Sequence, residues 1–140
     1  MIDFTSQFGQ TVKRHLAEEY FIWLTTVDSN LAPQPRPVWF IWQDDSFLIF
    51  SKPKAYKVRH VMKHPRVALQ FNTADGKAEQ DIIVFTGTAE IDASLPPAHE
   101  IPAYLEKYKT GIEGFGMSPE EFSQKYSVAI RVKEVSVRGW

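Results

Sequence analysis

The sequence predicts a mainly β fold, a six-stranded antiparallel β-barrel with flanking helices. Six segments rich in aromatic and β-branched residues are separated by turn residues or short helical patterns, which is typical of a small barrel. Aromatic residues make up 14% of the 140 residues, and such a surplus indicates a packed β core, an interface or a planar ligand. We expect one domain over residues 1–140, divided into an N-terminal helix (1–19), a barrel core with the ligand site (20–92), a helical insertion (93–126) and a last strand (127–140).

The start of the chain predicts a helix followed by a strand. Apolar side chains recur every four residues from Phe8 to Tyr20, so residues 6–19 predict an amphipathic helix, with Ser6 as its cap. The next segment, 20–27, reads YFIWLTTV and predicts a buried strand.

The second and third strands follow a turn at residues 28–30. Pro33, Pro35 and Pro37 alternate, and prolines cannot donate to a strand ladder, so the second strand is expected to begin at a sheet edge or mouth and to continue to Trp42. Turn residues at 44–46 lead into the third strand at 47–51.

The stretch from Phe47 to Arg66 is the most unusual part of the sequence. It contains no Asp or Glu, and residues 56–63 within it predict a two-turn helix after Pro53 breaks the strand. Six of the chain's 16 Lys and Arg lie here: Lys52, Lys54, Lys57, Arg59, Lys63 and Arg66. A strand that leads into a cationic helix start is what an anionic ligand, most often a phosphate, requires.

The segment after this basic stretch predicts two further strands, at 66–72 and 81–92, joined by a polar loop at 73–80. Gly87 lies inside the second of them, where a bulge or a close backbone approach is expected.

The helical insertion is predicted from helical spacing between Pro96 and Tyr108, followed by a loop over the glycines at 111–116. The sequence SPEE at 118–121 is a capping box with proline at the first helical position, so a second helix is expected up to Tyr126. Alternating apolar residues from 127 to 137 predict the last strand.

Composition excludes several classes of function. The chain has no Cys, which excludes disulfides and thiolate sites, and its net charge of −1 argues against nucleic-acid binding over the whole surface. No apolar signal core or membrane-length run occurs, so we expect a soluble cytoplasmic protein without a membrane partner. His60 and His64 lack a carboxylate at ligand spacing, and no metal site is predicted. No nucleophile elbow, acid–base pair or glycine-rich phosphate loop is present, so no catalytic side chain is predicted.

Four segments, in this order and at this spacing, resemble the pyridoxamine 5′-phosphate oxidase-like split β-barrels, and in particular their branch of flavin- or deazaflavin (F-420)-dependent oxidoreductases. They cover most of the chain and read IWLTTVDSNLAPQPRPVWFIW, FLIFSKPKAYKVRHVMKHPRVALQFN, VFTGTAEID and YSVAIRVKEVSVRGW. The resemblance implies an FMN-binding type of split barrel and a homodimer with FMN or F-420 between the two subunits. Tyr56 stands where the oxidases proper often have arginine, and their longer C-terminal substrate motif is absent, so pyridoxamine phosphate oxidation is not expected.

The resemblance also implies which residues contact the cofactor. The segment from Arg36 to Phe40 would lie along the flat ring, and Phe50 to Lys52 would lie beside the ribityl-phosphate tail. Lys57 matches the family's phosphate-binding lysine, and Arg59 is a further match. The full set carried over is Arg36, Pro37, Val38, Trp39, Phe40, Phe50, Ser51, Lys52, Lys57 and Arg59.

Several of these residues have an alternative structural interpretation. Lys57 could belong to a solvated basic helix face, and strand alternation places Trp39 on the face opposite Phe40 and Trp42, so one of these faces must be core or dimer contact. Trp140 ends the chain, where we expect it to pack on a partner subunit or on the ligand.

Three functions remain open from the sequence. The first is hydride transfer between bound FMN or F-420 and a small conjugated acceptor, in which the cofactor supplies the chemistry and the protein binds and orients it. The second is non-catalytic binding of FMN, F-420 or haem in the same groove. The third, single-strand nucleic-acid binding by a basic and aromatic barrel, is opposed by the confinement of positive charge to one short segment.

Overall fold

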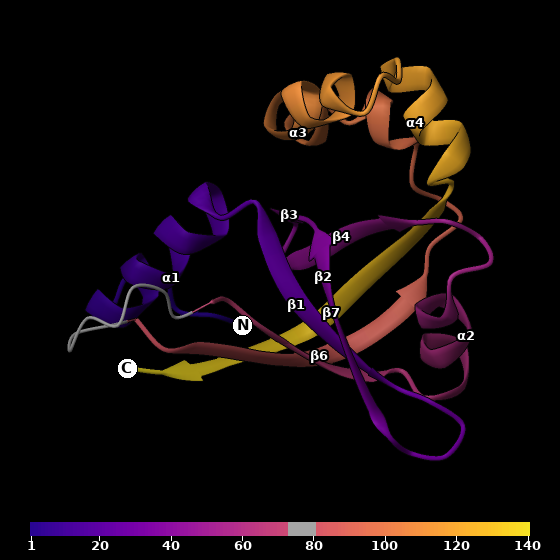
Figure 1. Cartoon of the computed structure of the whole chain (residues 1–140). Coiled ribbons are helices and arrows are strands. Elements are labelled where there is room, and N and C mark those ends of the chain that lie inside the picture. The colour runs from indigo at the N-terminus through magenta and orange to yellow at the C-terminus, as the bar shows by residue number, and fades with distance from the viewer. Residues whose placement is uncertain (73–80) are drawn as a thin grey trace.

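A strongly curled antiparallel sheet forms the body of the protein, and helices flank it (Figure 1). The computed structural model describes residues 1–72 and 81–140. Within this part of the chain the strands follow the order β2-β1-β5-β6-β7-β4-β3, and every pairing is antiparallel. The elements are α1 (Gln7–Glu18), β1 (Phe21–Val27), β2 (Pro33–Trp39), β3 (Ile41–Gln43), β4 (Ser46–Ser51), α2 (Tyr56–Lys63), β5 (Arg66–Gln70), β6 (Ile83–Ile91), the 3₁₀ turn η1 (Ala98–Glu100), α3 (Pro102–Gly114), α4 (Pro119–Lys125) and β7 (Val128–Gly139).

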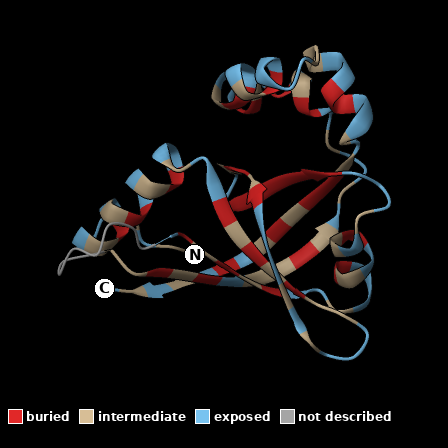
Figure 2. Ribbon diagram, in the orientation of Figure 1, coloured by how far each residue is buried: buried red, intermediate tan, exposed pale blue. Residues whose placement is uncertain are grey.

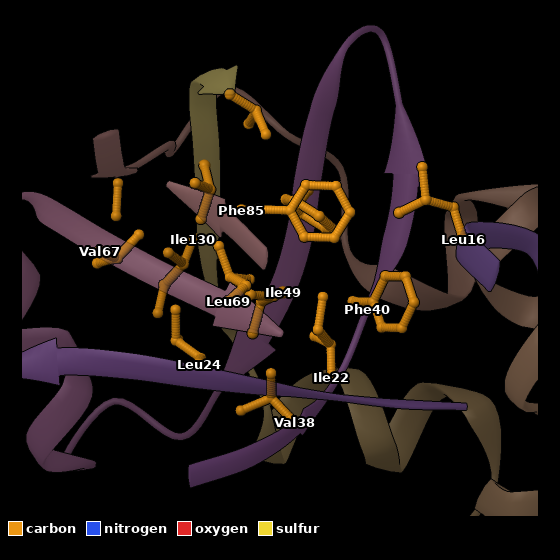
Figure 3. Packing of buried hydrophobic residues seen from close by; sticks show 14 of the residues in the cluster. Leu16, Ile22, Leu24, Val38, Phe40, Ile49, Val67, Leu69, Phe85 and Ile130 are labelled. Atoms are coloured by element: carbon orange, nitrogen blue, oxygen red, sulfur yellow. The ribbon is translucent and has the colours of Figure 1, made fainter. Parts of the chain in front are cut away.

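The main core lies inside the curled sheet. Figure 2 shows the buried residues concentrated on the strands, and Figure 3 shows Phe40, Ile22, Leu69 and Phe85 among the side chains that fill the interior. Burial of these apolar side chains supplies the main driving force for closing the sheet. The sheet therefore forms a half-barrel with a filled interior, and the mainly β prediction is confirmed.

A second apolar cluster joins the helical insertion to the outside of the sheet. Tyr104, Tyr108 and Ile112 of α3 pack against Ile41 and Leu48 of the β3–β4 hairpin. Their spacing of four residues places all three on one face of the helix. The helical layer of α3, η1 and α4 thus covers one side of the half-barrel near β3 and β4 (Figure 1).

Local sequence signals placed several elements correctly. Ser6 caps α1 by accepting the Gly9 N–H at 3.0 Å, and α2 occupies the predicted residues 56–63. Ser118 and Glu121 form the predicted capping box at the start of α4. Gly87 lies at a register shift between β6 and β7, where an added Cβ would come within 2.7 Å of Val132 Cγ1. The predicted loop at 73–80 lies outside the described residues.

Two predictions were wrong, and in both cases a tertiary contact overrode the local pattern. The loop predicted at 111–116 is helical up to Gly114, because α3 continues so that Gly111 packs against the Trp39 ring, where an added Cβ would lie only 2.9 Å from Trp39 Cη2. The single strand predicted up to Trp42 is divided into β2 and β3 at Phe40, whose N–H bonds to the Tyr108 hydroxyl instead of a strand partner. The sheet of the described residues therefore has seven strands, where the sequence predicted six. Among the described residues, no helix has the length and apolar character needed to cross a membrane.

Candidate ligand-binding site

The short helix α2 brings the basic stretch to the end of the barrel formed by β1, β2 and β6. Val58 and Val61 are buried in the main core, and they anchor the helix with its polar residues facing outward. Lys57 lies in the first turn, where unpaired backbone N–H groups carry partial positive charge. Both the helix start and the lysine therefore favour a bound anion at this end of α2.

A cavity of about 730 Å³, called here the cationic groove, opens between α2 and the ends of β1 and β2. Four basic side chains line it: Arg36 from β2 and Lys57, Arg59 and Lys63 from α2. Two histidines, His60 and His64, complete the α2 side. The resemblance implied that Arg36 lies along the ring of the ligand and Lys57 at its phosphate, and the structure brings both residues to the cationic groove, while Arg36 does not line the second cavity described below.

No carboxylate among the described residues forms a salt bridge with these four basic side chains. Asp28 also lines the groove, but its carboxylate accepts hydrogen bonds from the Asn30 and Ala32 N–H groups and from Gln34 Nε2. These bonds, the Ala32 bond foremost, lower the pKa of Asp28 and hold the β1–β2 turn. The positive charge of the groove is available for an anionic ligand.

A second, smaller cavity of about 200 Å³ adjoins the groove and is called here the aromatic slot. Its walls come from β1, β2, β4 and the helical layer, and most of them are apolar or aromatic. The lining side chains are Phe21, Pro37, Val38, Trp39, Phe50, Lys57, Tyr104, Phe115, Phe122 and Tyr126. A slot with these walls suits a flat aromatic ring.

Lys57 borders both cavities, and among residues 1–72 and 81–140 it is the one charged residue that lines the aromatic slot. Burial lowers the pKa of Lys57, and the nearby charges of Arg36 and Lys52 lower it further. An anion bound beside Lys57 would relieve this repulsion and favour the charged ammonium form. The pair of cavities therefore fits a ligand with a flat ring and an anionic tail that meet near Lys57.

The structure gathers seven of the predicted site residues at these two cavities. They are Arg36, Pro37, Val38, Trp39, Phe50, Lys57 and Arg59. Arg59 lies 4.8 Å from the centre of the Tyr56 ring, which holds its guanidinium on the outer rim of the groove.

Four predicted residues line neither cavity. Phe40 is 0% exposed in the main core (Figure 3), and its backbone bonds to Tyr108. Ser51 is buried and donates to the Lys52 carbonyl, while Lys52 is exposed with its ammonium 5.5 Å from the Tyr126 ring centre. Trp140 is 82% exposed at the end of the barrel opposite α2 (Figure 1).

Sequence reasoning missed the contribution of the helical layer to the slot. Tyr104, Phe115, Phe122 and Tyr126 all line it, and Phe115 lies in the turn that follows α3, as predicted. The only available signal was the four-residue spacing of Tyr104, Tyr108 and Ile112, which indicates an apolar helix face but not its partner. Thr26 was also missed, because a strand residue gave no sign that its hydroxyl would lie 2.8 Å from His60 Nδ1 beside the groove.

The other histidine of the groove has an unusual environment. Nε2 of His64 is buried and has no hydrogen-bond partner among the described residues. Buried polar atoms are normally paired, so a site for a ligand or water atom is the ordinary explanation of such a nitrogen. Within residues 1–72 and 81–140, no group of three or more His, Asp or Glu is arranged to hold a metal ion.

The fold is shared with several solved structures of low sequence identity. A conserved hypothetical protein, Rv2991 from Mycobacterium tuberculosis, is 19% identical with a TM-score of 0.76, over 97% of this chain and 84% of its own. HutZ, a haem storage protein from Vibrio cholerae, is 15% identical with a TM-score of 0.66, over 96% and 95% of the two chains. An F420 reductase is 22% identical with a TM-score of 0.61, over 91% and 92%. At these identities the similarity establishes the split-barrel fold alone.

Sequence comparison gives the family. The comparison with curated proteins found no match. A family model described as pyridoxamine 5′-phosphate oxidase matches residues 8–139, which include both cavities and all but the ends of the chain. The chain therefore belongs to the pyridoxamine 5′-phosphate oxidase family.

Proposed function

We propose that the protein is an oxidoreductase that binds FMN or F-420 and transfers a hydride between this cofactor and a small conjugated acceptor. The observation that carries the proposal is the position of Lys57, which borders the aromatic slot on one side and the cationic groove on the other. Both cofactors join a flat tricyclic ring to a phosphorylated ribityl chain, so their two halves match the two cavities.

The ring half would contact the slot. Trp39 and Phe50 offer flat apolar surface from β2 and β4, and Tyr126 offers it from the end of α4. Stacking and edge-on contacts with such side chains orient a planar ring and exclude water from its faces. Pro37 lacks an N–H, so the edge strand exposes carbonyls more than donors at this point.

The phosphate half would contact the groove. Lys57 supplies an ammonium, the first turn of α2 offers backbone N–H groups, and Arg36 reaches the same cavity from β2. A hydrogen bond to a charged group contributes about 1.5–3 kcal/mol. The groove is longer than one phosphate needs, since Arg59 and Lys63 line it beyond Lys57, and this length favours F-420, whose tail carries further carboxylates.

The residues of the site fit a role in binding more than in proton transfer. Hydride transfer is supplied by the cofactor when it is bound. The side chains of the slot would hold the ring close to the acceptor and keep water away, and such positioning is a large source of rate acceleration. No side chain is assigned as a general acid.

We also propose that the protein acts as a homodimer whose second subunit completes the slot. Phe21 and Phe115, on the rim of the slot, are 50% and 65% exposed. Large apolar side chains grouped beside an open cavity mark an interaction surface. A second copy over this rim would cover the ring of the ligand.

The decisive test compares Lys57→Gln with Lys54→Gln, an exposed lysine on the same segment that lines neither cavity. The dissociation constants for FMN and F-420 would be measured by fluorescence titration. Loss of the charge-assisted bond at Lys57 should weaken the preferred cofactor by about 10- to 100-fold. Lys54→Gln should bind like the wild type. The proposal would be refuted if the wild type bound neither FMN nor F-420. It would also be refuted if Lys57→Gln bound the cofactor as tightly as Lys54→Gln does.

A second candidate is a non-catalytic carrier of haem or flavin, favoured by the buried Nε2 of His64 beside the groove, which has no hydrogen-bond partner in the part of the chain that the structure describes. Haem binding would give a Soret band that shifts in His64→Gln. Turnover of reduced FMN or F-420 with a panel of quinone-like acceptors would instead identify the enzyme.

A further inference from the structure

One face of α3 holds the chain at the break between β2 and β3. Lys107, Tyr108 and Gly111 lie on this face at helical spacing, and each of them contacts Trp39 or Phe40. None of the three lines the aromatic slot, but Trp39 does. The geometry of the slot therefore depends on a helix face that no ligand would touch.

The Tyr108 hydroxyl is the centre of this contact. It accepts the Phe40 N–H at 2.8 Å, and it lies 2.7 Å from the carbonyl oxygens of both Phe40 and Tyr20, to one of which its single proton is donated. Lys107 Nζ donates to the same Phe40 carbonyl at 3.1 Å. Burial raises the pKa of the Tyr108 hydroxyl, so it keeps its proton and remains a donor. Both backbone groups of Phe40 are thus fixed by α3.

The rings extend this contact to Trp39, the preceding residue. The Tyr108 and Trp39 rings are stacked with their centres 4.5 Å apart and their planes 9° apart. Gly111, one turn further along α3, leaves room for the Trp39 indole, because a Cβ there would come within 2.9 Å of it. The indole is stacked on Phe122 of the slot wall as well, at 5.7 Å and 22°.

We propose that Tyr108 is a positioning residue that holds Trp39 as a fixed flat wall of the aromatic slot and thereby gives the slot its selectivity for planar polycyclic ligands. The inference rests on the proposed placement of a planar ring in the slot, but not on whether that ring belongs to FMN or F-420. The stacking sets the plane of the indole, and the hydrogen bonds from Tyr108 and Lys107 prevent the Phe40 backbone from rotating it. A preformed wall lowers the ordering cost of binding a flat ligand.

The test is Tyr108→Phe, which keeps the stacked ring and removes only the hydroxyl. Two probes separate the cavities: lumichrome, a flavin tricycle without a tail, for the slot, and pyrophosphate for the groove. We expect lumichrome affinity to fall about tenfold, because the Phe40 N–H and one backbone carbonyl lose their hydrogen bonds to the hydroxyl, while pyrophosphate affinity stays unchanged. The near-UV circular dichroism of the stacked Trp39–Tyr108 pair should weaken in parallel.

Ser123→Ala is the matched control. Ser123 is buried in the same helical layer and bonds to the His99 N–H and ring, at 3.0 and 2.8 Å, but it lines neither cavity. It should lower stability without changing lumichrome affinity or the near-UV signal. If Tyr108→Phe does not fold, Gly111→Ala decides, because its added methyl displaces the indole while the hydroxyl remains.

The inference is overturned if the wild type does not bind lumichrome, if the variant that folds binds it as tightly as the wild type, or if Ser123→Ala loses as much affinity. A wild type that binds lumichrome but neither FMN nor F-420 would refute the proposed function and leave this inference standing. A wild type that binds a cofactor while Tyr108→Phe keeps full lumichrome affinity would refute this inference alone.

Discussion

The ammonium of Lys107 is partly buried, which is unfavourable for a charge, but it helps to fix the Phe40 backbone. The ammonium lies 3.8 Å from the centre of the Phe40 ring and donates to the Phe40 carbonyl. Burial lowers the pKa of Lys107 to about 8, and the charge of Glu19 only partly opposes this shift. The folded protein therefore holds the Lys107 proton less tightly than the unfolded chain does.

This shift predicts a pH dependence of stability. Below about pH 8 the amine is charged in both states, and the folded state carries the full cost of burying the charge. As the pH rises above this value the folded state loses the proton first, so the free energy of unfolding rises until the unfolded chain also titrates. We expect Lys107→Met to be more stable than the wild type at pH 7, by a margin that narrows between pH 8 and pH 9.5.

Urea denaturation at several pH values would measure this margin. Lys109→Met, at an exposed position of the same helix, should show a difference from the wild type that does not change over this range. A margin for Lys107→Met that is equally independent of pH would contradict the burial of the charge.

The same residues show how far sequence reasoning reaches at this scale. The position of Lys57 beside a cavity could be predicted because charge, helix start and motif all pointed to one position. Alternation showed that Trp39 and Phe40 face opposite ways but not which of them meets a ligand, because this depends on α3, some 70 residues further along the chain. The burial of Phe40 and the stacking of Trp39 are both set by that distant contact.

At the scale of the elements, the β3–β4 hairpin has a strained two-residue turn. Gln43 pairs with Ser46, and the two residues between them, Asp44 and Asp45, both have φ of 54°. Two-residue turns with positive φ at both positions match strand twist, but they favour Asn-Gly over residues with a larger side chain. The turn was predicted from its residue types. The free-energy cost of positive φ at two non-glycine residues can be recognised only from the backbone angles.

Asp45→Gly should raise the free energy of unfolding by about 1 kcal/mol, because glycine adopts positive φ without a Cβ clash. Chemical denaturation of the apo protein is the measurement. Asp45→Ala, which retains the Cβ and loses the local polar side chain, should be less stable than the wild type. If Asp45→Gly proves less stable than Asp45→Ala, the positive φ is not what limits this turn.

The elements that sequence reasoning predicted correctly are those specified by adjacent residues. Caps at Ser6 and Ser118 fixed two helix starts, and His64-Pro65 marked the end of α2. The length of α3 and the division of β2 from β3 could not be predicted, since a glycine that packs under an indole and a tyrosine that replaces a strand partner are long-range contacts. Local propensity indicates a loop at Gly111, and packing against Trp39 overrides it.

At the scale of the whole molecule, both cavities lie at the end of the half-barrel that carries α2 and the helical layer. The chain terminus lies at the other end, where the backbone of Trp140 pairs with that of Ile82 while its side chain is exposed (Figure 1). Within one protomer, Trp140 therefore cannot reach a ligand beside Lys57. If Trp140 contributes to the site, as the sequence led us to expect, it must do so from a second copy.

This arrangement makes the proposed homodimer testable by subunit exchange. A site composed of Lys57 from one protomer and Trp140 from its partner is damaged in both the Lys57→Gln dimer and the Trp140→Ala dimer. In a hybrid dimer one site receives both substitutions and the other receives neither. After equal mixing and random reassociation in a two-fold symmetric dimer, about a quarter of all sites should therefore bind cofactor normally.

Cofactor titration of the exchanged mixture, with light scattering to confirm the dimer, measures this fraction. The mixture of Lys57→Gln with the Lys57→Gln/Trp140→Ala double variant contains no intact site and should recover nothing. A Trp140→Ala dimer that binds cofactor as tightly as the wild type, or a protein that stays monomeric at micromolar concentration, would show that Trp140 does not complete the site of a partner subunit.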